Sequence, residues 1–286
     1  MIATMTNPQT LTLAEKAEIV ETSEANVFRA ALGNLPPELM AEYGAGCQEV
    51  GGAAAYFFAK MPAVIFNRVT GLGIQQPATE AMVDELIEFY VRRQTPFGID
   101  LSPAAQPTQL AAWLLERGLR PSYNLAKVIR GTEPPPHIET DLTIEPVTEA
   151  NAAHFAHVAV GGFGMPDWMA PLFEMVATLP NIYSYLAYAD DEPAAIGSMY
   201  AGDGVAALFN GATLPEYRRR GGQGAIMARR IQDAIAMGCQ WVTTETGEDT
   251  PEAPNPSYHN MLRTGFHPAY LRPTYVYEPK TVVSGL

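Results

Sequence analysis

Arginine and glycine residues gather in one short segment in the second half of the chain. Residues 134–286 carry 8 basic and 17 acidic side chains, yet five of the eight basic ones are arginines within thirteen consecutive positions. Three of these arginines lead directly into a turn with glycine at positions 221, 222 and 224. Guanidinium groups concentrated in an otherwise acidic half indicate an anionic ligand, because arginine binds phosphate and carboxylate groups well.

The residues around this turn predict a strand over 206–214 followed by a helix over 222–237, whose apolar positions fall on one face. The first amides of a helix have no partner within the helix, and the helix dipole adds partial positive charge there. Because glycine carries no side chain, an anion can approach the backbone closely. The segment therefore predicts a binding site for a diphosphate.

Two common diphosphate-binding motifs do not fit this segment. A P-loop requires Lys and then Ser or Thr after its last glycine, whereas Ala225 and Ile226 follow here. The dinucleotide-binding motif requires a third glycine at position 227, which is Met. The sequence thus argues against nucleoside triphosphates and NAD as ligands.

The segment Leu214–Ala225 resembles motif A of the GNAT superfamily of acetyl-CoA-dependent N-acetyltransferases, in a frame that starts at Arg218 or at Arg219. We prefer the first frame because it keeps Pro215-Glu-Tyr217 where such proteins commonly have Pro-x-Tyr/Phe. Ser257–Phe266 is similar to motif B of the same superfamily. The resemblance implies acetyl-CoA as co-substrate, no metal, and these cofactor-binding residues: Ala212, Thr213, Leu214, Arg219, Arg220, Gly221, Gly222, Gln223, Gly224 and Asn260.

The resemblance also implies a mechanism in which an amine attacks the thioester directly, in a ternary complex between splayed strands at 206–214 and 240–245. The reaction needs a base and an acid. Strand 206–214 contains no carboxylate, so we expect Glu245 to be the base. Met261 occupies the position where the family often has a Tyr that acts as the general acid. Tyr258 is therefore the expected acid, with His259 and Tyr270 as alternatives.

Two short similarities indicate that the two halves of the chain are related copies. Glu116–Tyr123 is similar to Arg263–Tyr270 at an offset of 147 residues, and Phe66–Thr70 is similar to Phe209–Thr213 at an offset of 143. The order of the two matches is the same in both halves. The pattern therefore favours the two-domain, tandem type of GNAT protein.

The elements that must position the motifs are expected to form an α/β (α+β) fold of two tandem GNAT-like domains, each a mixed, mostly antiparallel sheet flanked by helices. Three consecutive prolines at 134–136 predict an extended linker. We predict these domains: 1–132, a degenerate GNAT-like domain; 133–142, a Pro-rich linker; and 143–286, the catalytic GNAT domain.

Within the predicted domains, the hydrophobic pattern gives the following elements. In the second half we expect strands over 143–147, 183–189, 195–200, 206–214, 240–245, 266–271 and 274–278, with helices over 149–158, 222–237 and 257–264. In the first half we expect strands over 63–70, 97–101 and 121–130, with helices over 78–93 and 108–117.

The turn of the first copy that corresponds to motif A has lost the features that suit a phosphate. Residues 71–80 contain no arginine, and Glu80 enters the following helix. An acid at a helix N-terminus competes with phosphate for the same positive end. We therefore expect that the first domain no longer binds CoA, and that it forms a wall of the active cleft or an interface.

Composition restricts the class of protein. Hydrophobic residues make up 47% and charged residues 17%, which is typical of a soluble globular chain, and the net charge of -13 disfavours nucleic acid and anionic membranes. Cys47 and Cys239 lie far apart, and no apolar run approaches the ~20 residues that span a bilayer. We expect a cytoplasmic protein with reduced thiols. His154 and His157 lack a third metal ligand nearby.

These observations favour an N-acetyltransferase that acts on an amine of a small molecule, and the net charge of -9 in residues 134–286 favours a cationic acceptor. The alternative is a non-catalytic CoA-binding regulatory or scaffold protein, because Met261 and the strand without a carboxylate lack the usual catalytic groups. A phosphate-binding module unrelated to CoA is a third hypothesis. The sequence leaves a homo-oligomer open.

Overall fold

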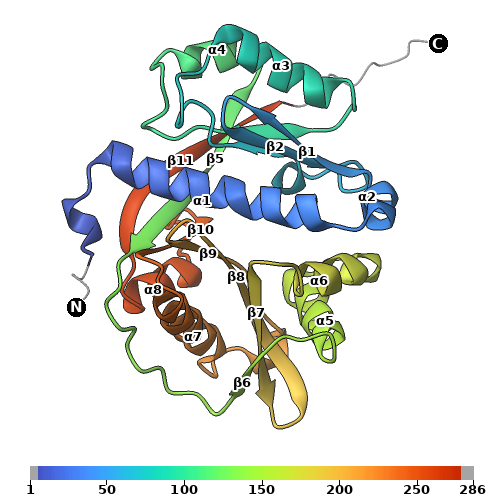
Figure 1. The fold of residues 1–286 in the computed structure, drawn as a ribbon, viewed down its shortest axis with the longest axis vertical. Helices are drawn as coiled ribbons and strands as arrows, with labels where there is room; N and C mark the ends of the chain where they lie inside the picture. The colour runs from blue at the N-terminus through green and yellow to red at the C-terminus, as the bar shows by residue number, and fades with distance from the viewer. Residues whose placement is uncertain (1–5, 278–286) are drawn as a thin grey trace. The chain divides into compact units, whose positions relative to one another are not determined.

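The computed structural model describes residues 6–277. The chain divides into two compact units, each of which contains strands and helices (Figure 1). Unit 1 holds the described residues up to Leu35 together with Ala126–Tyr270, and unit 2 holds Pro36–Leu125 and the described residues from Leu271 onward. Strands β5 (Arg120–Arg130) and β11 (His267–Tyr277) contribute to both units, since the unit boundaries fall inside them.

Unit 2 is a sheet with the strand order β1-β2-β3-β4-β11, in which only the β3–β4 pair is parallel. Buried apolar residues of α3 and α4 pack with those of the strands in one core. The elements of this unit are α2 (Pro37–Tyr43), β1 (Ala45–Val50), β2 (Ala53–Phe58), β3 (Arg68–Thr70), α3 (Glu80–Val91), β4 (Phe97–Asp100) and α4 (Leu110–Glu116).

Unit 1 contains the consecutive strands β10-β9-β8-β7-β6, of which only β10 and β9 are parallel to each other. Its elements are α1 (Leu13–Asn34), β6 (Thr143–Pro146), α5 (Ala152–Phe163), α6 (Ala170–Val176), β7 (Ile182–Ala189), β8 (Glu192–Gly202), β9 (Val205–Thr213), α7 (Gly222–Ala236), β10 (Trp241–Gly247) and α8 (Pro256–Arg263).

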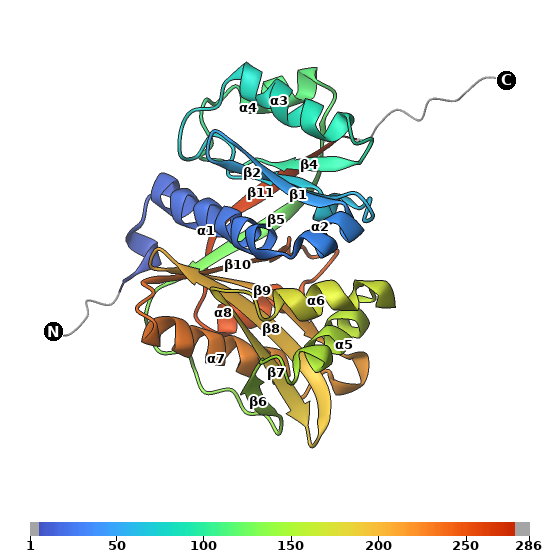
Figure 2. The same cartoon turned by 45° about the vertical axis from the view of Figure 1, so that its right-hand side comes forward.

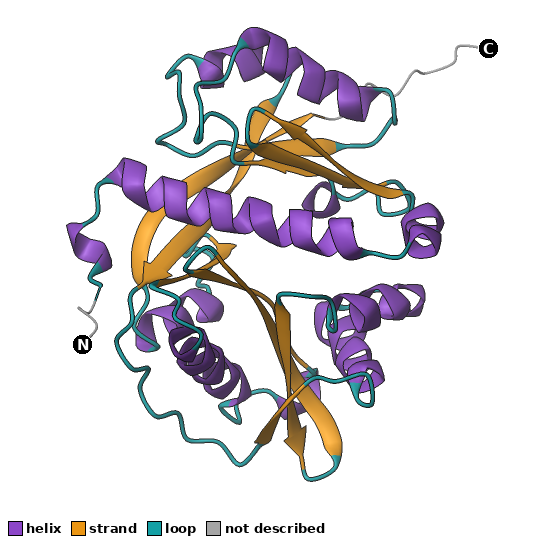
Figure 3. Cartoon of the chain, in the orientation of Figure 1, coloured by secondary structure: helices purple, strands orange, loops and turns teal. Residues whose placement is uncertain are grey.

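Helices flank the strands of unit 1 on both faces (Figure 3). In two views α7 and α8 lie on one side of β8 and β9, and α5 and α6 lie on the other (Figure 2). Helix α7 buries the face that its sequence predicts, because Ile226, Met227, Ile231 and Ala234 are all less than a tenth exposed. This packing fixes the start of α7 beside the end of β9.

Most predicted elements of residues 143–277 are present, with ends shifted by a few residues. The two closing strands predicted at 266–271 and 274–278 are instead one strand, β11, and the last predicted position, 278, lies outside the described residues. The strand predicted at 63–70 is shorter, because residues 64–66 form a 3-10 turn before β3.

Helix α1 is the main element that our sequence analysis did not predict. Thr12 caps this helix, and Glu15 returns the bond to the Thr12 amide, which is a capping box that the sequence displays. The helix belongs to unit 1, where it packs against β9 and β10. The compact units therefore have boundaries different from those of the predicted domains, and the division at 132 and 143 stays a prediction.

Three further features concern location and metal binding. None of the helices in residues 6–277 is long and apolar enough to cross a membrane. The same residues contain no cluster of three His, Cys, Asp or Glu side chains that could hold a metal. Cys47 is exposed and Cys239 is buried, and both are free thiols.

Candidate functional site

The site lies where strands β9 and β10 separate. Their parallel pairing joins Val205–Ala207 to Trp241–Thr243, at the start of both strands. One residue further on, the link is made by a side chain, since the Thr244 hydroxyl donates to the Leu208 carbonyl at 3.0 Å. The chain direction is the same in both strands, so their carboxyl ends form the two walls of an opening, as the sequence analysis predicted for 206–214 and 240–245.

A bulge in β9 shapes the first wall. The register with β8 pairs Ile196 with Ala212 but Ser198 with Phe209, so Asn210 and Gly211 together face one residue of β8. Asn210 has a φ of 52°, in the left-handed region. A bulge of this kind takes backbone groups out of the ladder and turns the strand. The opening is therefore bordered by backbone polar groups that the sheet does not use.

Helix α7 begins beside this wall with a glycine in place of a capping side chain. Gly221 has a φ of 79°, and no side-chain hydrogen bond caps the helix in the part of the chain that the structure describes. A Cβ built at Gly221 would lie 2.3 Å from the carbonyl oxygen of Glu139, so only glycine fits at this position. Arg219 also has a left-handed φ, of 68°. The first-turn amides of α7 are thus left for water or a ligand.

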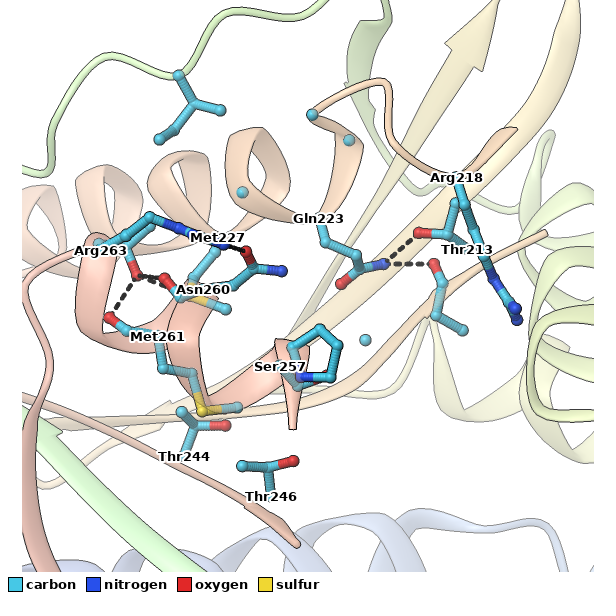
Figure 4. Close-up of a pocket in the computed structure, with 18 of the residues that line it drawn as sticks. Thr213, Arg218, Gln223, Met227, Thr244, Thr246, Ser257, Asn260, Met261 and Arg263 are labelled. Atoms are coloured by element: carbon cyan, nitrogen blue, oxygen red, sulfur yellow. Dashed lines mark hydrogen bonds between the residues drawn. The ribbon is translucent and has the colours of Figure 1, made fainter. Parts of the chain in front are cut away.

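Gln223 ties the start of α7 to the end of β9 (Figure 4). Its side-chain amide donates to the Thr213 hydroxyl at 2.9 Å and also to the Ala212 carbonyl oxygen. A third, longer bond of 3.3 Å reaches the Ile196 carbonyl of β8. Gln223 therefore acts through its side chain as a tether that holds the helix N-terminus against the bulged strand.

These elements enclose a cleft of about 870 Å³ in unit 1. The turn before α7, the ends of β9 and β10, and helix α8 form most of its walls. On α8, Asn260 accepts a hydrogen bond from Arg263, and both side chains line the cleft (Figure 4). A cleft of this size, with convergent backbone donors and guanidinium groups, can hold an elongated anionic ligand.

Residues 124–250 match the family model described as Acetyltransferase (GNAT) domain. Over these residues the chain is similar to a GNAT domain. This match covers the bulged strand, the glycine turn and helix α7, which build one side of the cleft, and it ends before α8. No curated protein matches the chain in sequence.

Solved structures resemble the whole fold at low sequence identity. A GCN5-related N-acetyltransferase from Kribbella flavida has a TM-score of 0.60 at 18% identity, over 90% of this chain and 96% of that one. A tandem GNAT protein from the clavulanic acid biosynthesis pathway has 0.60 at 13%, over 95% and 96%. A GCN5-related N-acetyltransferase from Sphaerobacter thermophilus has 0.55 at 13%, over 96% and 95%.

The predicted fold class is confirmed: the chain is an α/β protein with two GNAT-like parts in tandem, built on mixed, mostly antiparallel sheets flanked by helices. At these identities the likeness shows the fold alone. The roles of individual residues in the GNAT domain must therefore be argued from the geometry of this chain.

The cleft of the GNAT domain brings together nine of the twelve residues that the sequence singled out. These residues come from β9, the turn, α7, β10 and α8, and they are Ala212, Thr213, Arg219, Gly221, Gly222, Gln223, Gly224, Glu245 and Asn260. Arg218, which the preferred motif frame includes, also lines the cleft. Their assignment to cofactor binding and catalysis stays a prediction.

Three predicted residues do not line this cleft. The Leu214 side chain is buried and its amide donates to the Ala194 carbonyl. Arg220 turns to the Pro-rich segment, where its Nε lies 3.1 Å from both carboxylate oxygens of Asp141 and lowers the pKa of that carboxyl group. Tyr258 packs against the buried core of the GNAT domain.

The two alternative acids are engaged elsewhere. His259 Nε2 lies 3.2 Å from the Asp249 carboxylate, in the loop after β10. The Tyr270 hydroxyl donates to the fully buried Glu21 carboxylate of α1 at 2.7 Å. Neither side chain is among those that line the cleft.

Glu245 is held by an ion pair that the sequence analysis did not foresee. Its carboxylate oxygen lies 2.7 Å from the Lys127 ammonium of β5, and the same ammonium lies 2.8 Å from the Glu24 carboxylate of α1. Lys127 is 3% exposed, Glu24 is 12% exposed and Glu245 is 25% exposed. Glu245 is thus the member of this group that faces the cleft.

Arg230 is a second residue whose position depends on the fold. The sequence groups it with the anion-binding arginines, but it is 2% exposed on α7 and donates to the carbonyls of Ser198 and Phe209, at 2.8 and 3.2 Å. Burial lowers the pKa of this guanidinium to about 10. The Phe209 carbonyl precedes the bulge at Asn210, so Arg230, which also lines the cleft, supports the bulged wall.

Replacing Arg230 with Met is expected to lower the free energy of unfolding by about 1–3 kcal/mol, because two buried carbonyls lose a charged donor. Urea unfolding followed by circular dichroism measures the change. Arg229→Met is the matched control: Arg229 is partly exposed and pairs with Asp233 on the next turn, so its loss should cost less than about 1 kcal/mol. Equal effects of the two changes would contradict the supporting role of Arg230.

Proposed function

We propose that the chain is an N-acetyltransferase that moves an acetyl group from acetyl-CoA to an amine of a small molecule, by direct attack in a ternary complex in the cleft of unit 1. The observation that carries this proposal is the start of α7, where Gly221 takes the place of a capping side chain. This helix start lines the cleft together with Arg218, Arg219 and the bulged end of β9. The match of residues 124–250 to the GNAT family supports it.

The residues of the cleft fit the coenzyme. The amides of Gly222, Gln223 and Gly224 are first-turn donors of a helix without a capping side chain among the described residues, which suits a diphosphate. Arg218 and Arg219 add positive charge at the same wall. Asn260 lines the cleft from α8, as motif B predicts for a contact to the pantetheine amides. When bound, acetyl-CoA supplies the acetyl group as an activated thioester.

The corresponding helix of unit 2 is built differently. Helix α3 is capped by the Thr79 hydroxyl, which accepts from the Met82 amide, and its first residue, Glu80, pairs with Arg117 at 2.9 Å. A cap and an acid occupy the positions that α7 leaves to a ligand. This contrast supports the prediction that the first half of the chain has lost CoA.

A buried ion cluster also closes the ends of the parallel pair in unit 2. Arg272 donates to the Thr70 hydroxyl at the end of β3 at 3.1 Å, and it pairs with Asp100 at the end of β4 at 3.0 Å. Arg68 lies 3.1 Å from the same carboxylate. The strand ends that form a cleft in unit 1 are therefore joined by side chains in unit 2, which supports one coenzyme site per chain.

In the proposed reaction Glu245 accepts the proton that the attacking amine loses. Its carboxylate suits this role because Glu245 lines the cleft. The Lys127 ion pair holds this carboxylate in a fixed position. Backbone amides near Ala212 and Thr213, next to the bulge, hold the carbonyl oxygen of the thioester. The small acceptor carries an amine, and the acidic balance of residues 134–286 favours one that is cationic.

A non-catalytic CoA-binding protein is the second candidate function. One observation favours it: neither Tyr258 nor its two alternatives line the cleft, so the expected proton donor for the leaving thiolate is not at the site. Such a protein would bind CoA and release no thiol. A cytoplasmic location stays a prediction, which the two free thiols support.

Calorimetric titration and a thiol assay together test the proposed function. We expect CoA to bind with a stoichiometry of one per chain and far more tightly than inorganic pyrophosphate. We expect acetyl-CoA to release free CoA thiol above background with at least one member of a broad amine panel. Two equivalents of CoA would overturn the single-site prediction, binding without thiol release would favour the scaffold, and a site that does not prefer CoA to pyrophosphate would reject both.

A further inference from the structure

Beside the cleft, three elements of unit 1 contribute charged side chains to one place. Lys127 of β5 lies between Glu24 of α1 and Glu245 of β10, at 2.8 and 2.7 Å. Next to Glu24, α1 also contacts β10 directly, because the hydroxyls of Ser23 and Thr243 are 3.0 Å apart and both residues are buried. Helix α1 is thus fixed against the strand that carries Glu245.

Two carboxylates share the Lys127 ammonium in this group. Burial makes this sharing important, because charges in a protein interior are screened much less than charges in water. Lys127 divides its attraction between two acids, and the share that Glu245 receives depends on Glu24.

Other titratable groups on the elements that pack against β10 have partners of their own. From α1, Glu21 accepts the hydroxyl hydrogen of Tyr270 in β11. From α8, Tyr258 packs on the core and His259 pairs with Asp249. Strand β9 carries no titratable side chain over Val205–Thr213. The Lys127 ammonium, at 2.7 Å, is in direct contact with the Glu245 carboxylate.

We propose that Lys127 and Glu24 are positioning residues that set the basicity of Glu245: Lys127 stabilises its carboxylate, and Glu24 weakens that effect because it pairs with the same ammonium. This inference rests on the proposed function, in which Glu245 is the base. It assigns a role in the reaction to α1, which lies outside the matched residues 124–250. A base held ionised but not overly stabilised is what proton transfer near neutral pH requires.

The two positioning residues should shift the acidity of Glu245 in opposite directions. A base must be ionised to act, so activity falls as the pH drops through its pKa. Removing the cation with Lys127→Met favours the neutral acid, which moves this acidic limb to higher pH by about one to three units. Removing the competing carboxylate with Glu24→Gln takes away a negative charge next to the Lys127–Glu245 pair, which favours the ionised form of Glu245 and moves the limb to lower pH.

The experiment measures kcat/KM against pH for the full chain, with the acceptor identified by the thiol assay. It compares the wild type, Lys127→Met, Glu24→Gln and the double variant. Glu18→Gln, an exposed change on the same helix, is the matched control and should leave the profile unchanged. In the double variant we expect an upward shift smaller than with Lys127→Met alone, because the second carboxylate no longer repels the charge on Glu245.

A titration that does not depend on turnover accompanies the kinetics. Carbon-13 NMR of labelled glutamate follows the Glu245 carboxyl group, which is assigned by the loss of its signal in Glu245→Gln. Opposite shifts in Lys127→Met and Glu24→Gln support the proposal. Shifts of the same sign, or an unmoved carboxyl resonance, would overturn it even if CoA binds and thiol is released. Should Lys127→Met fail to fold, the nearly isosteric Glu24→Gln still decides the sign.

Discussion

Replacing Glu245 with Gln is expected to lower kcat by about 100- to 10,000-fold, the usual contribution of a general base. The amide keeps the shape of the side chain and can still contact Lys127, but it cannot accept the proton of the attacking amine. Lys127 retains its pairing with Glu24, so the fold should persist. The rate of CoA thiol release at saturating acetyl-CoA and acceptor measures the effect.

The affinity for CoA separates this loss from damage to the site. Calorimetry should give the same Kd for CoA in Glu245→Gln and in the wild type, because the proposed diphosphate contacts lie at the start of α7. Glu252→Gln, an exposed change in the loop after β10, provides the matched control and should retain full activity. A kcat within threefold of the wild type would show that Glu245 is not the base.

A Gly221→Ala change is expected to weaken CoA binding by at least about tenfold, which corresponds to ~1.4 kcal/mol. Gly221 has a φ of 79°, and the added Cβ would lie 2.3 Å from the Glu139 carbonyl oxygen. The backbone on one side of this contact must move, and the first-turn amides of α7 move with it. Calorimetric titration of the folded variant with CoA measures the result.

The opposite end of the same helix provides a control with the same backbone strain. Gly238 has a φ of 86°, and no described atom lies within 4 Å of a Cβ built there. Alanine costs about 1–2 kcal/mol in stability at either position, because both residues are left-handed. Gly238→Ala should therefore lose stability and keep its affinity for CoA. If both variants bind CoA equally well, the geometry of the Gly221 turn does not govern binding.

The glycine turn and its surroundings could be predicted from the sequence because their chemistry is local. The turn lies between a strand and a helix that are close in the sequence, and it contains Gly221, Gly222 and Gly224. Hydrophobic periodicity identifies both elements. The resemblance to the GNAT superfamily implied that the two strands of the cleft separate. Nine of the twelve predicted site residues line one cleft for this reason.

The binding partners of the Arg220 and Arg230 side chains could not be predicted from the same segment. Both belong to the cluster that suggested an anion, yet Arg220 binds Asp141, 79 positions away, and Arg230 donates to carbonyls of β8 and β9. A guanidinium group has the same donors wherever it lies, so its partner depends on which backbone or carboxylate group the fold brings near. Local spacing does not contain that information.

The sequence by itself determined the type of the chemistry: a glycine start for one helix, arginines beside it and an α/β order of elements. Only the tertiary structure brought together the side chains that we propose to control that chemistry. Lys127 pairs with Glu245, which is 118 positions away in the sequence, and with Glu24 of α1, which is 103 positions away. Such pairs form because buried charges must find partners in space, and the packing of β5, β10 and α1 selects which partners are within reach.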